Sequence, residues 1–206
     1  MSNQTKVLNL YAGIGGNRKL WNDVDVTAIE WDEEKATIYR DHFPNDTVVV
    51  TDAHEYLKDN FSNFDFIWSS PPCPTHSRIR YAGKGKQNDP VYPDMNLYQE
   101  ILFLQGYYEG DYVVENVNGW YDPLIEPQKR QRHYFWSNFQ IPPIDLSKSN
   151  IYEGTISEWE SDLGFDLSKY DLTHNKRRKI LRNCVKPKLG EHILNAATKN
   201  RQATLF

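Results

Sequence analysis

The sequence predicts an α/β protein built on a mostly parallel β-sheet with helices on both faces. Short runs of β-branched and aromatic residues recur through the first 115 positions, and segments with apolar residues at helical spacing lie between them. Strand and helix therefore alternate, which is typical of a parallel sheet. The chain has 206 residues, of which 39% are hydrophobic, and this suits one domain with a sizeable core.

The predicted strands are short and apolar. In chain order they cover residues 7–11, 26–30, 47–50, 64–68 and 112–114, and a further strand covers 134–139 after a turn at 128–132. The predicted helices cover residues 17–22, 33–42, 53–60, 95–106 and 189–199. Within the fourth helix, Leu97, Ile101, Leu102 and Leu104 lie at helical spacing. Residues 141–175 break the pattern with Pro, Ser, Asp and Gly, so we expect an irregular insert there.

The charge of the chain is uneven. Its net value of −4 argues against a uniformly basic binder, yet a local basic surface is enough to contact a phosphate backbone. The alternative is that each basic stretch is only a solvated face. The three basic stretches are Arg78, Arg80, Lys84 and Lys86; then Lys129, Arg130 and Arg132; then Lys176, Arg177, Arg178, Lys179, Arg182, Lys186 and Lys188.

Cysteine usage and hydropathy exclude several classes of protein. Two distant cysteines, Cys73 and Cys184, cannot form a disulfide framework, and their neighbours match no zinc pattern. No segment approaches the roughly 20 apolar residues of a membrane span, and residues 2–6 do not resemble a signal peptide. We therefore expect a reduced, metal-free, soluble and cytoplasmic protein.

Polar groups follow the first three predicted strands in order. The first strand runs into the loop Gly13-Ile14-Gly15-Gly16, whose backbone can approach a ligand closely. The second ends at Glu30-Trp31, where a carboxylate can accept ribose hydroxyls and an indole can stack on adenine. The third is followed by Asp52, placed to accept from an adenine amino group. Ordinary strand-end turns explain each feature separately, but the three in order favour an adenosine cofactor.

Cys73 stands between Pro72 and Pro74, just after the predicted strand at 64–68. The prolines prevent the chain from continuing as helix or sheet, so the cysteine side chain is held outward at the sheet edge. This is how a nucleophile is presented. The alternative is that Cys73 is a small buried apolar residue, as many free cysteines are.

Glu115 ends the strand at 112–114. Buried beside an apolar wall, its carboxyl would keep a proton near neutral pH, which suits a general acid. The alternative is an ordinary acidic residue at a strand end. In the segment 128–132 the long polar side chains alternate, so we expect Arg130 and Arg132 to point the same way and to bind a phosphate or the carbonyl oxygen of a base.

These motifs resemble, in order, those of the cytosine-5 DNA methyltransferases, and the resemblance covers most of the chain. Residues 9–16 resemble the family's Asp-Leu-Phe-Ala-Gly-x-Gly-Gly loop, Pro72-Cys73 its catalytic Pro-Cys, and Glu115-Asn116-Val117 its Glu-Asn-Val acid. Residues 97–104 resemble the helix after the cysteine, and residues 128–132 resemble Gln-x-Arg-x-Arg. Residues 182–187 resemble the late Gly-Asn-Ala-Val-Pro segment that returns to the cofactor.

The resemblance implies a Rossmann-like methyltransferase sheet, S-adenosylmethionine as cofactor and double-stranded DNA as substrate. Cys73 would add to C6 of a flipped cytosine while Glu115 acts at N3, and Arg130 and Arg132 complete the catalytic set. The implied cofactor contacts are Tyr11, Ala12, Gly13, Ile14, Gly15, Gly16, Glu30, Trp31, Asp52, Ala53, Pro72, Leu97 and Asn183. The expected DNA contacts are Ser77, Arg78, Arg80, Lys84, Lys86, Lys176, Arg177, Arg178 and Lys179.

The chain departs from the family pattern at single residues and in size. Asn9, Pro74 and His76 stand where the family has Asp, Gln and Phe. Only about fifty residues separate Arg132 from Asn183, where the family carries a separate target-recognition domain. We therefore expect a catalytic domain from residues 1–140 and 180–206, and a reduced recognition insert at 141–179. Such a compact form suits a phage or restriction-modification enzyme.

Three functions are consistent with the residues. The first is a monomeric enzyme that methylates C5 of cytosine in DNA, with or without an accessory specificity partner. The second is a non-catalytic, DNA-binding or regulatory member of the family, and the third is the same chemistry with another transferred group or an RNA substrate. The presence of Cys73, Glu115, Arg130 and Arg132 together favours the enzyme.

Overall fold

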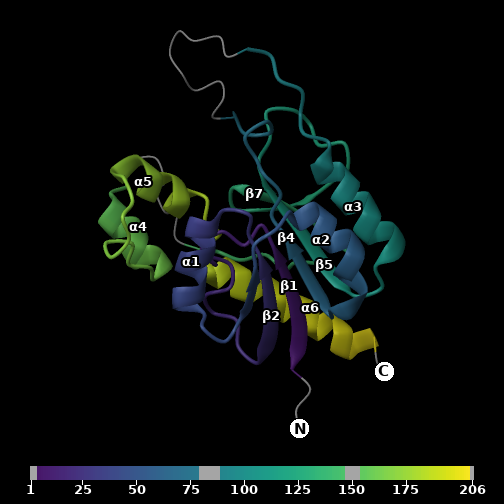
Figure 1. Ribbon diagram of the computed structural model, residues 1–206. Coiled ribbons are helices and arrows are strands. Elements are labelled where there is room, and N and C mark those ends of the chain that lie inside the picture. The colour runs from purple at the N-terminus through teal and green to yellow at the C-terminus, as the bar shows by residue number, and fades with distance from the viewer. Residues whose placement is uncertain (1–3, 79–88, 147–153, 205–206) are drawn as a thin grey trace.

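The computed structural model describes residues 4–78, 89–146 and 154–204, and within them seven strands form a single sheet in the order β3-β2-β1-β4-β5-β7-β6 (Figure 1). The strands are β1 Thr5–Leu10, β2 Val24–Ile29, β3 Thr47–Val49, β4 Phe66–Ser69, β5 Asp111–Val117, β6 Gln128–Arg130 and β7 His133–Ser137. The first five pair in parallel, and β7 is antiparallel to both β5 and β6. The predicted α/β fold is confirmed.

Helices cover both faces of this sheet because apolar side chains of the central strands alternate between them. Leu8 of β1 packs with helices α2 and α3, whereas its neighbour Val7 packs with α6. Figure 1 shows α2 and α3 on one face of the sheet and α6 on the other. The helices are α1 Glu33–His42, α2 Ala53–Asn60, α3 Asn96–Tyr107, α4 Ile156–Leu163, α5 His174–Arg182 and α6 Pro187–Thr204, and a 3-10 turn, η1, covers Phe61–Asn63. The prediction at 189–199 corresponds to α6, which is longer at both ends.

Helices α1 and α2 begin and end where the sequence predicts, and an aspartate caps the N-terminus of each. Asp32 accepts hydrogen bonds from the backbone N–H groups of Glu34 and Lys35, and Asp52 accepts one from Glu55. These aspartates satisfy amide donors that the first helical turn leaves unpaired. They therefore fix the points at which the chain turns from strand to helix at the sheet edge.

Two predicted elements are wrong. Residues 17–22 are not a helix, because the chain makes successive turns in which Arg18 N–H donates to Gly15 O at 3.1 Å and Trp21 N–H to Arg18 O at 3.0 Å. These turns deliver Trp21 into the core against Trp68. The segment 128–132 is not simply a turn either, because residues 128–130 form strand β6 and the chain reverses at Gln131, which has φ 55°.

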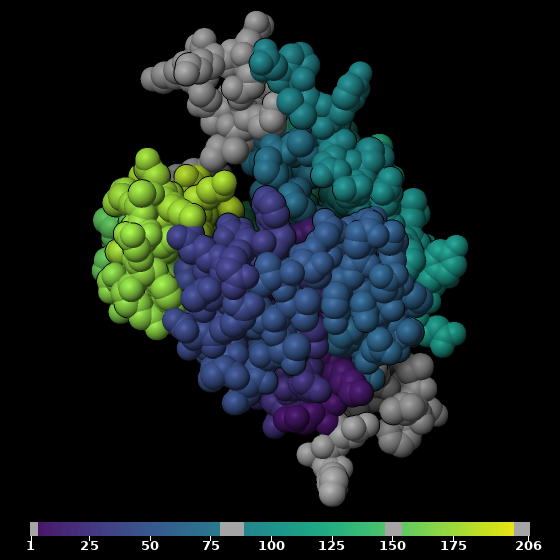
Figure 2. All heavy atoms as spheres, viewed as in Figure 1, coloured from purple at the N-terminus to yellow at the C-terminus, as the bar shows by residue number. Residues whose placement is uncertain are grey.

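The insert is more regular than expected. Helix α4 begins with a reciprocal capping box between Thr155 and Glu158 and ends at Gly164, whose φ of 69° is left-handed. Thr173 caps the N-terminus of helix α5, where its side chain accepts a hydrogen bond from the Lys176 N–H. Together, residues 154–182 form what we call the α4–α5 lobe, which packs beside α1 (Figure 2). Trp159 and Leu163 lie four residues apart and anchor α4 in the apolar cluster shared with α1.

Candidate active site

The candidate site lies where the order of the parallel strands reverses. The chain runs outward from β1 to β2 and β3, then returns to β4 on the other side of β1. Because these strands are parallel, their carboxyl ends share one edge, and ligands of open α/β sheets bind at the reversal point. The glycine loop follows β1 and the segment around Cys73 follows β4, so the structure brings both to this place.

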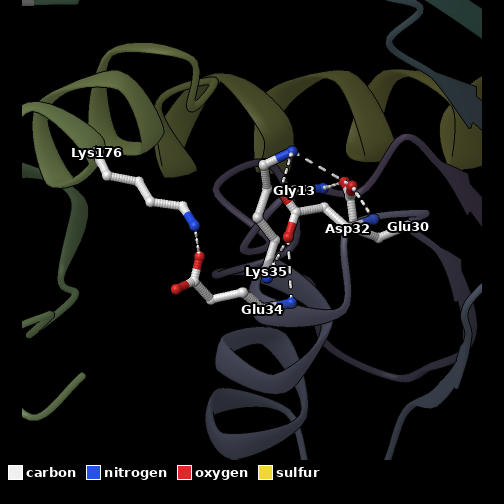
Figure 3. A network of polar contacts seen from close by, with 6 residues as sticks. All are labelled: Gly13, Glu30, Asp32, Glu34, Lys35 and Lys176. Carbon is white, nitrogen blue, oxygen red and sulfur yellow. Dashed lines mark hydrogen bonds and ion pairs between the residues drawn. The ribbon is translucent and has the colours of Figure 1, made fainter. Parts of the chain in front are cut away.

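The Glu30 carboxylate is 4% exposed and organises the glycine loop. Its Oε2 accepts from the Gly13 N–H at 2.9 Å, and its Oε1 accepts from the Asp32 N–H at 3.0 Å. The Lys35 ammonium lies 3.3 Å from the same Oε1 and 3.5 Å from an oxygen of Asp32 (Figure 3). Glu30 therefore holds the loop against the end of β2, and Lys35 balances the two carboxylates.

The surface above this loop is open to a ligand. Gly13 has φ 58°, and a Cβ built there would meet no atom within 4 Å, so the backbone is accessible from that side. The indole of Trp31 is 75% exposed although it is large and apolar. One oxygen of Asp52 is used to cap α2, at 2.9 Å from the Glu55 N–H. An approachable backbone, an exposed aromatic face and two carboxylates fit an adenosine cofactor.

The end of the chain closes the glycine loop from behind. A Cβ on Gly16 would lie 2.7 Å from the carbonyl oxygen of Val185 and 2.8 Å from Cβ of Cys184. Only glycine allows this approach. The segment after Asn183 therefore returns to the loop, as the sequence motif implies, while Asn183 itself is the exposed C-cap of α5.

The other predicted cofactor contacts occupy different surroundings. Pro72 is exposed and Gly15 packs on the ring of Phe43, whereas the Tyr11 hydroxyl is bound to Glu100. The remaining members are buried at 7% exposure or less: Ala12, Ile14, Ala53 and Leu97. Leu97 belongs to the apolar core between α3 and the sheet. Contact of these residues with a cofactor stays a prediction.

The loop that carries Cys73 is fastened to the neighbouring strand. Asn116 Nδ2 on β5 donates to the carbonyl oxygen of Pro71 at 3.0 Å, and both groups are buried. The carbonyl oxygen of Cys73 accepts from the N–H groups of His76 and Ser77, each at 3.0 Å. Cys73 is thus held in a tight turn with a partly exposed side chain, directly beside the end of β5.

The chemistry of Cys73 depends on Glu115. Burial, and then the negative charge of Glu115, raise the pKa of the Cys73 thiol, whereas the positive charges of Arg132 and Lys179 lower it. Burial raises the pKa of the Glu115 carboxyl to about 7, against a hydrogen bond from Ser70 and the charge of Arg132, both of which lower it. Burial therefore favours the protonated form of Glu115 near neutral pH, in a position where its charge acts on the thiol.

The two arginines of the segment 128–132 do not point the same way, contrary to the sequence prediction. Arg130 on β6 donates to the carbonyl oxygens of Ile141 and Pro142, where the insert begins. Arg132 donates to the carbonyl oxygen of Arg182 at 3.1 Å, and its charge acts on Glu115. The reversal at Gln131 separates them, because it breaks the alternation of side chains. Arg132 is the one that faces the site.

Sequence reasoning missed a buried carboxylate that joins the parts of the site. Glu100 on α3 is 0% exposed and accepts hydrogen bonds from the hydroxyls of Tyr11 and Ser69, the latter at 2.5 Å. Nδ1 of His54 on α2 lies 3.2 Å away, and this contact raises the pKa of the imidazole. Glu100 therefore links the ends of β1 and β4. The signal was present, since Glu100 interrupts the apolar face formed by Leu97, Ile101 and Leu104.

The predicted DNA contacts of the α4–α5 lobe are mostly committed to internal contacts. Lys176 forms an ion pair with Glu34 of α1 (Figure 3). Arg177 donates to backbone carbonyl groups at 168 and 170, and the guanidinium of Arg178 lies 5.5 Å from the ring centroid of Trp159. These three residues hold the lobe together and attach it to α1, and their contact with DNA stays a prediction. Lys179 is exposed, and its charge acts on Cys73.

The loop after Cys73 is described only at its start. Ser77 forms a β-bridge with Gly119, and Arg78 Nε donates to the Gly119 carbonyl oxygen at 2.7 Å. The remaining predicted contacts, Arg80, Lys84 and Lys86, lie outside the described residues. In the described part of the chain, no cluster of three or more His, Cys, Asp and Glu side chains is suited to a metal, and no helix is long and apolar enough to cross a bilayer.

Comparison with known proteins identifies the family. Residues 5–124, more than half of the chain, match the family model for C-5 cytosine-specific DNA methylases. The chain belongs to this family. The methyl donor of the family is S-adenosylmethionine, which the open glycine loop, Trp31 and Glu30 fit. With β7 antiparallel at the far side of β5, the fold is the Rossmann-like sheet of S-adenosylmethionine-dependent methyltransferases.

Individual relatives match only parts of the chain. A tRNA (cytosine(38)-C(5))-methyltransferase of Spodoptera frugiperda is 23% identical over 158 residues, which are 70% of this chain and 46% of the relative. The chain thus spans about half the length of this curated relative. The crystal structure of a DNMT2 mutant from the same organism is 26% identical, with a TM-score of 0.40, and covers 56% of this chain and 36% of that one. A methyltransferase from Agrobacterium tumefaciens is 14% identical, with a TM-score of 0.40, over 59% of this chain and 41% of that one.

Proposed function

We propose that this member of the C5-cytosine family transfers a methyl group from S-adenosylmethionine to C5 of cytosine in double-stranded DNA, with Cys73 as nucleophile and Glu115 as general acid. The observation that carries the proposal is the pairing of these two groups at the edge of β4 and β5. The negative charge of Glu115 raises the pKa of the Cys73 thiol. Asn116, next to Glu115 on β5, donates a hydrogen bond to the carbonyl oxygen of Pro71 in the loop that carries Cys73.

The reaction needs both groups because C5 of cytosine is a poor nucleophile. The Cys73 thiolate forms a bond to C6, and a proton from Glu115 at N3 accepts the electron density displaced into the ring. C5 then has enamine character and can take the methyl group that S-adenosylmethionine supplies as a sulfonium. A base, for which we propose a water molecule, then takes the C5 proton, the C6–S bond breaks to release the Cys73 thiolate, and N3 returns its proton to Glu115, which restores the aromatic ring.

The mutual effect of the two groups favours this sequence of steps. The Glu115 charge opposes formation of the thiolate, so the thiolate forms more readily when Glu115 holds its proton. A neutral Glu115 beside an ionised Cys73 is the productive state, and Arg132 and Lys179 stabilise the thiolate. A base inside a duplex must first be flipped out, at a cost of a few kcal/mol. Arg78, which follows Cys73 and Ser77 in the chain, is our candidate for contact with the opened strand.

The second candidate is methylation of cytosine in RNA. It is favoured by one specific observation, namely that the curated relative spanning 70% of this chain is a tRNA methyltransferase. The family model, by contrast, describes DNA methylases. The chemistry of Cys73 and Glu115 serves either substrate, because C6 and N3 are the same in both.

One experiment separates these substrates. The protein is incubated with labelled S-adenosylmethionine and either random-sequence duplex DNA or total tRNA, and the digested nucleosides are analysed by mass spectrometry. We expect 5-methyldeoxycytidine with wild type and none with Cys73→Ser. Label in 5-methylcytidine only would establish the RNA reaction, and label in neither, from protein that binds S-adenosylhomocysteine, would contradict both.

A further inference from the structure

A buried histidine contacts the candidate general acid from the side opposite the Cys73 loop. His133 begins β7 and lies opposite Val117 of β5, while Glu115 lies opposite Phe135. Residues two apart on a strand share a face, so His133 and Glu115 are diagonal neighbours on one face of the pair. Nε2 of His133 is 3.7 Å from Oε1 of Glu115, and the histidine is 5% exposed.

The surroundings of His133 determine which ring nitrogen carries its proton. Burial, and then the positive charge of Arg132, lower the pKa of His133 to about 3, so the imidazole is neutral and has one N–H. Nδ1 is buried and has no hydrogen-bond partner among the described residues. On the Nε2 side, by contrast, the structure places an acceptor, the Glu115 carboxyl, at 3.7 Å. The proton therefore belongs on Nε2, because a buried N–H without an acceptor is the costlier arrangement.

The other neighbours of Glu115 cannot fix its orientation in the same way. Ser70, on the β4 side, is a hydroxyl that rotates and serves a carboxyl or a carboxylate equally well, and it also accepts from Trp68 Nε1 at 2.8 Å. Arg132 contributes charge to the site and donates to a backbone carbonyl, and Cys73 stands on the reacting side. Among these described neighbours, the imidazole of His133 is the neutral ring that presents one N–H in a fixed plane.

We propose that His133 is a positioning residue that acts through Glu115: its Nε2–H is directed at Oε1, so that the acidic proton resides on Oε2. This role of His133 rests on the proposed function, because Glu115 is the general acid of the same reaction. The 3.7 Å separation shortens to a hydrogen bond when Glu115 loses its proton, because a charged carboxylate attracts an N–H donor more strongly than a neutral carboxyl does. Charge on Glu115 is stabilised by this donor, and loss of the donor makes the carboxyl a weaker acid.

The test is the titration of Glu115 in the free protein, followed by ¹³C NMR of labelled glutamate side chains and assigned with Glu115→Gln. His133→Phe keeps the size of the ring but removes the donor, and we expect the Glu115 midpoint to rise by about one pH unit, the effect of one hydrogen bond to a charged group. His133→Gln places an amide N–H near the position of Nε2 and should restore the wild-type midpoint. An unchanged midpoint in His133→Phe would overturn the proposal.

A second pair of variants covers the case in which His133→Phe does not fold. His133→Asn is too short to reach Glu115, so its midpoint should rise, whereas that of His133→Gln should not. Equal midpoints in these two variants would also refute the role of Nε2. Methylation rates are then measured as a function of pH. The fall in rate at alkaline pH should move to higher pH in the variants in which the titration midpoint of Glu115 rises. Because the NMR titration needs no substrate, inactivity of wild type would count against the proposed function alone.

Discussion

Replacing the carboxyl of Glu115 by an amide should stabilise the folded protein at alkaline pH while it reduces activity. The pKa of Glu115 is raised from 4.5 to about 7, mainly by burial. At about 1.4 kcal/mol per pH unit, the charged carboxylate therefore costs about 3 kcal/mol in the folded state. The amide of Glu115→Gln has nearly the same shape and does not ionise, so it avoids this cost.

The direction with pH follows from proton binding. Below pH 4.5 the carboxyl is protonated in both folded and unfolded chains, and the substitution has little effect on this term. Between 4.5 and about 7 only the unfolded chain loses the proton, so wild type is progressively destabilised. Above about 7 the full difference is present. The advantage of Glu115→Gln should thus grow by about 3 kcal/mol from pH 4.5 to pH 8.

The assay is urea unfolding of both proteins at pH 4.5, 6 and 8, with the free energy of unfolding compared at each pH. Glu126→Gln, on the exposed surface, controls for the removal of one negative charge. The same preparations should show methylation by Glu115→Gln reduced by about 10²- to 10⁴-fold, the usual contribution of a general acid. A stability difference that stays constant from pH 4.5 to pH 8 would refute the argument that burial keeps a proton on Glu115.

Four further outcomes are expected. Cys73→Ser should abolish methylation, and it should also abolish covalent trapping of the protein on DNA that contains 5-fluorocytosine. The variant should still bind S-adenosylhomocysteine normally, as measured by calorimetry. Trp31→Ala should weaken that binding about tenfold, through loss of one aromatic contact, and unchanged affinity would remove the indole from the cofactor site. Glu100→Ala should lower the free energy of unfolding by about 3 kcal/mol, because it leaves buried hydroxyls unpaired. Lys179→Ala should reduce the log-log salt slope of DNA binding by about 0.9, whereas Lys176→Ala, already paired within the protein, should not. Equal slopes for these two variants would contradict the division of the basic run.

Much of the fold was predictable because its signals are local. Helices α1 and α2 were found at their observed bounds, since each combines an aspartate cap with apolar residues at helical spacing. Strands β1, β2, β4 and β5 contain buried apolar runs, and β3 is a short β-branched run at the sheet edge. The rule that parallel strands end at one edge predicted that Glu30 and Cys73 lie at the same edge. Helix α4 was missed although its capping box and terminal glycine stand in the sequence, because the surrounding prolines and polar residues dominated the pattern.

The parts of the site that escaped prediction depend on long-range contacts. Whether Lys176 is a free cation or the partner of Glu34 is decided by how α5 docks on α1, which no local pattern encodes. Similarly, the alternation of side chains along a strand predicts that Arg130 and Arg132 point the same way. The left-handed turn at Gln131 breaks this alternation, so the two side chains point in different directions. His133 gave no signal, because its importance comes only from its diagonal position next to Glu115.

The packing of Gly16 against Val185 has a consequence for the order in which the protein becomes functional. The glycine loop is synthesised well before the residues that close it from behind, because Val185 lies far downstream of Gly16 in the chain. A nascent chain can form the early strands, but nothing packs behind its glycine loop until Val185 and the start of α6 have been synthesised and have docked. Cofactor capture is thereby delayed until the α4–α5 lobe, which lies between these segments, has also been made. A chain that stops before Cys184 therefore lacks the packing that supports its cofactor loop.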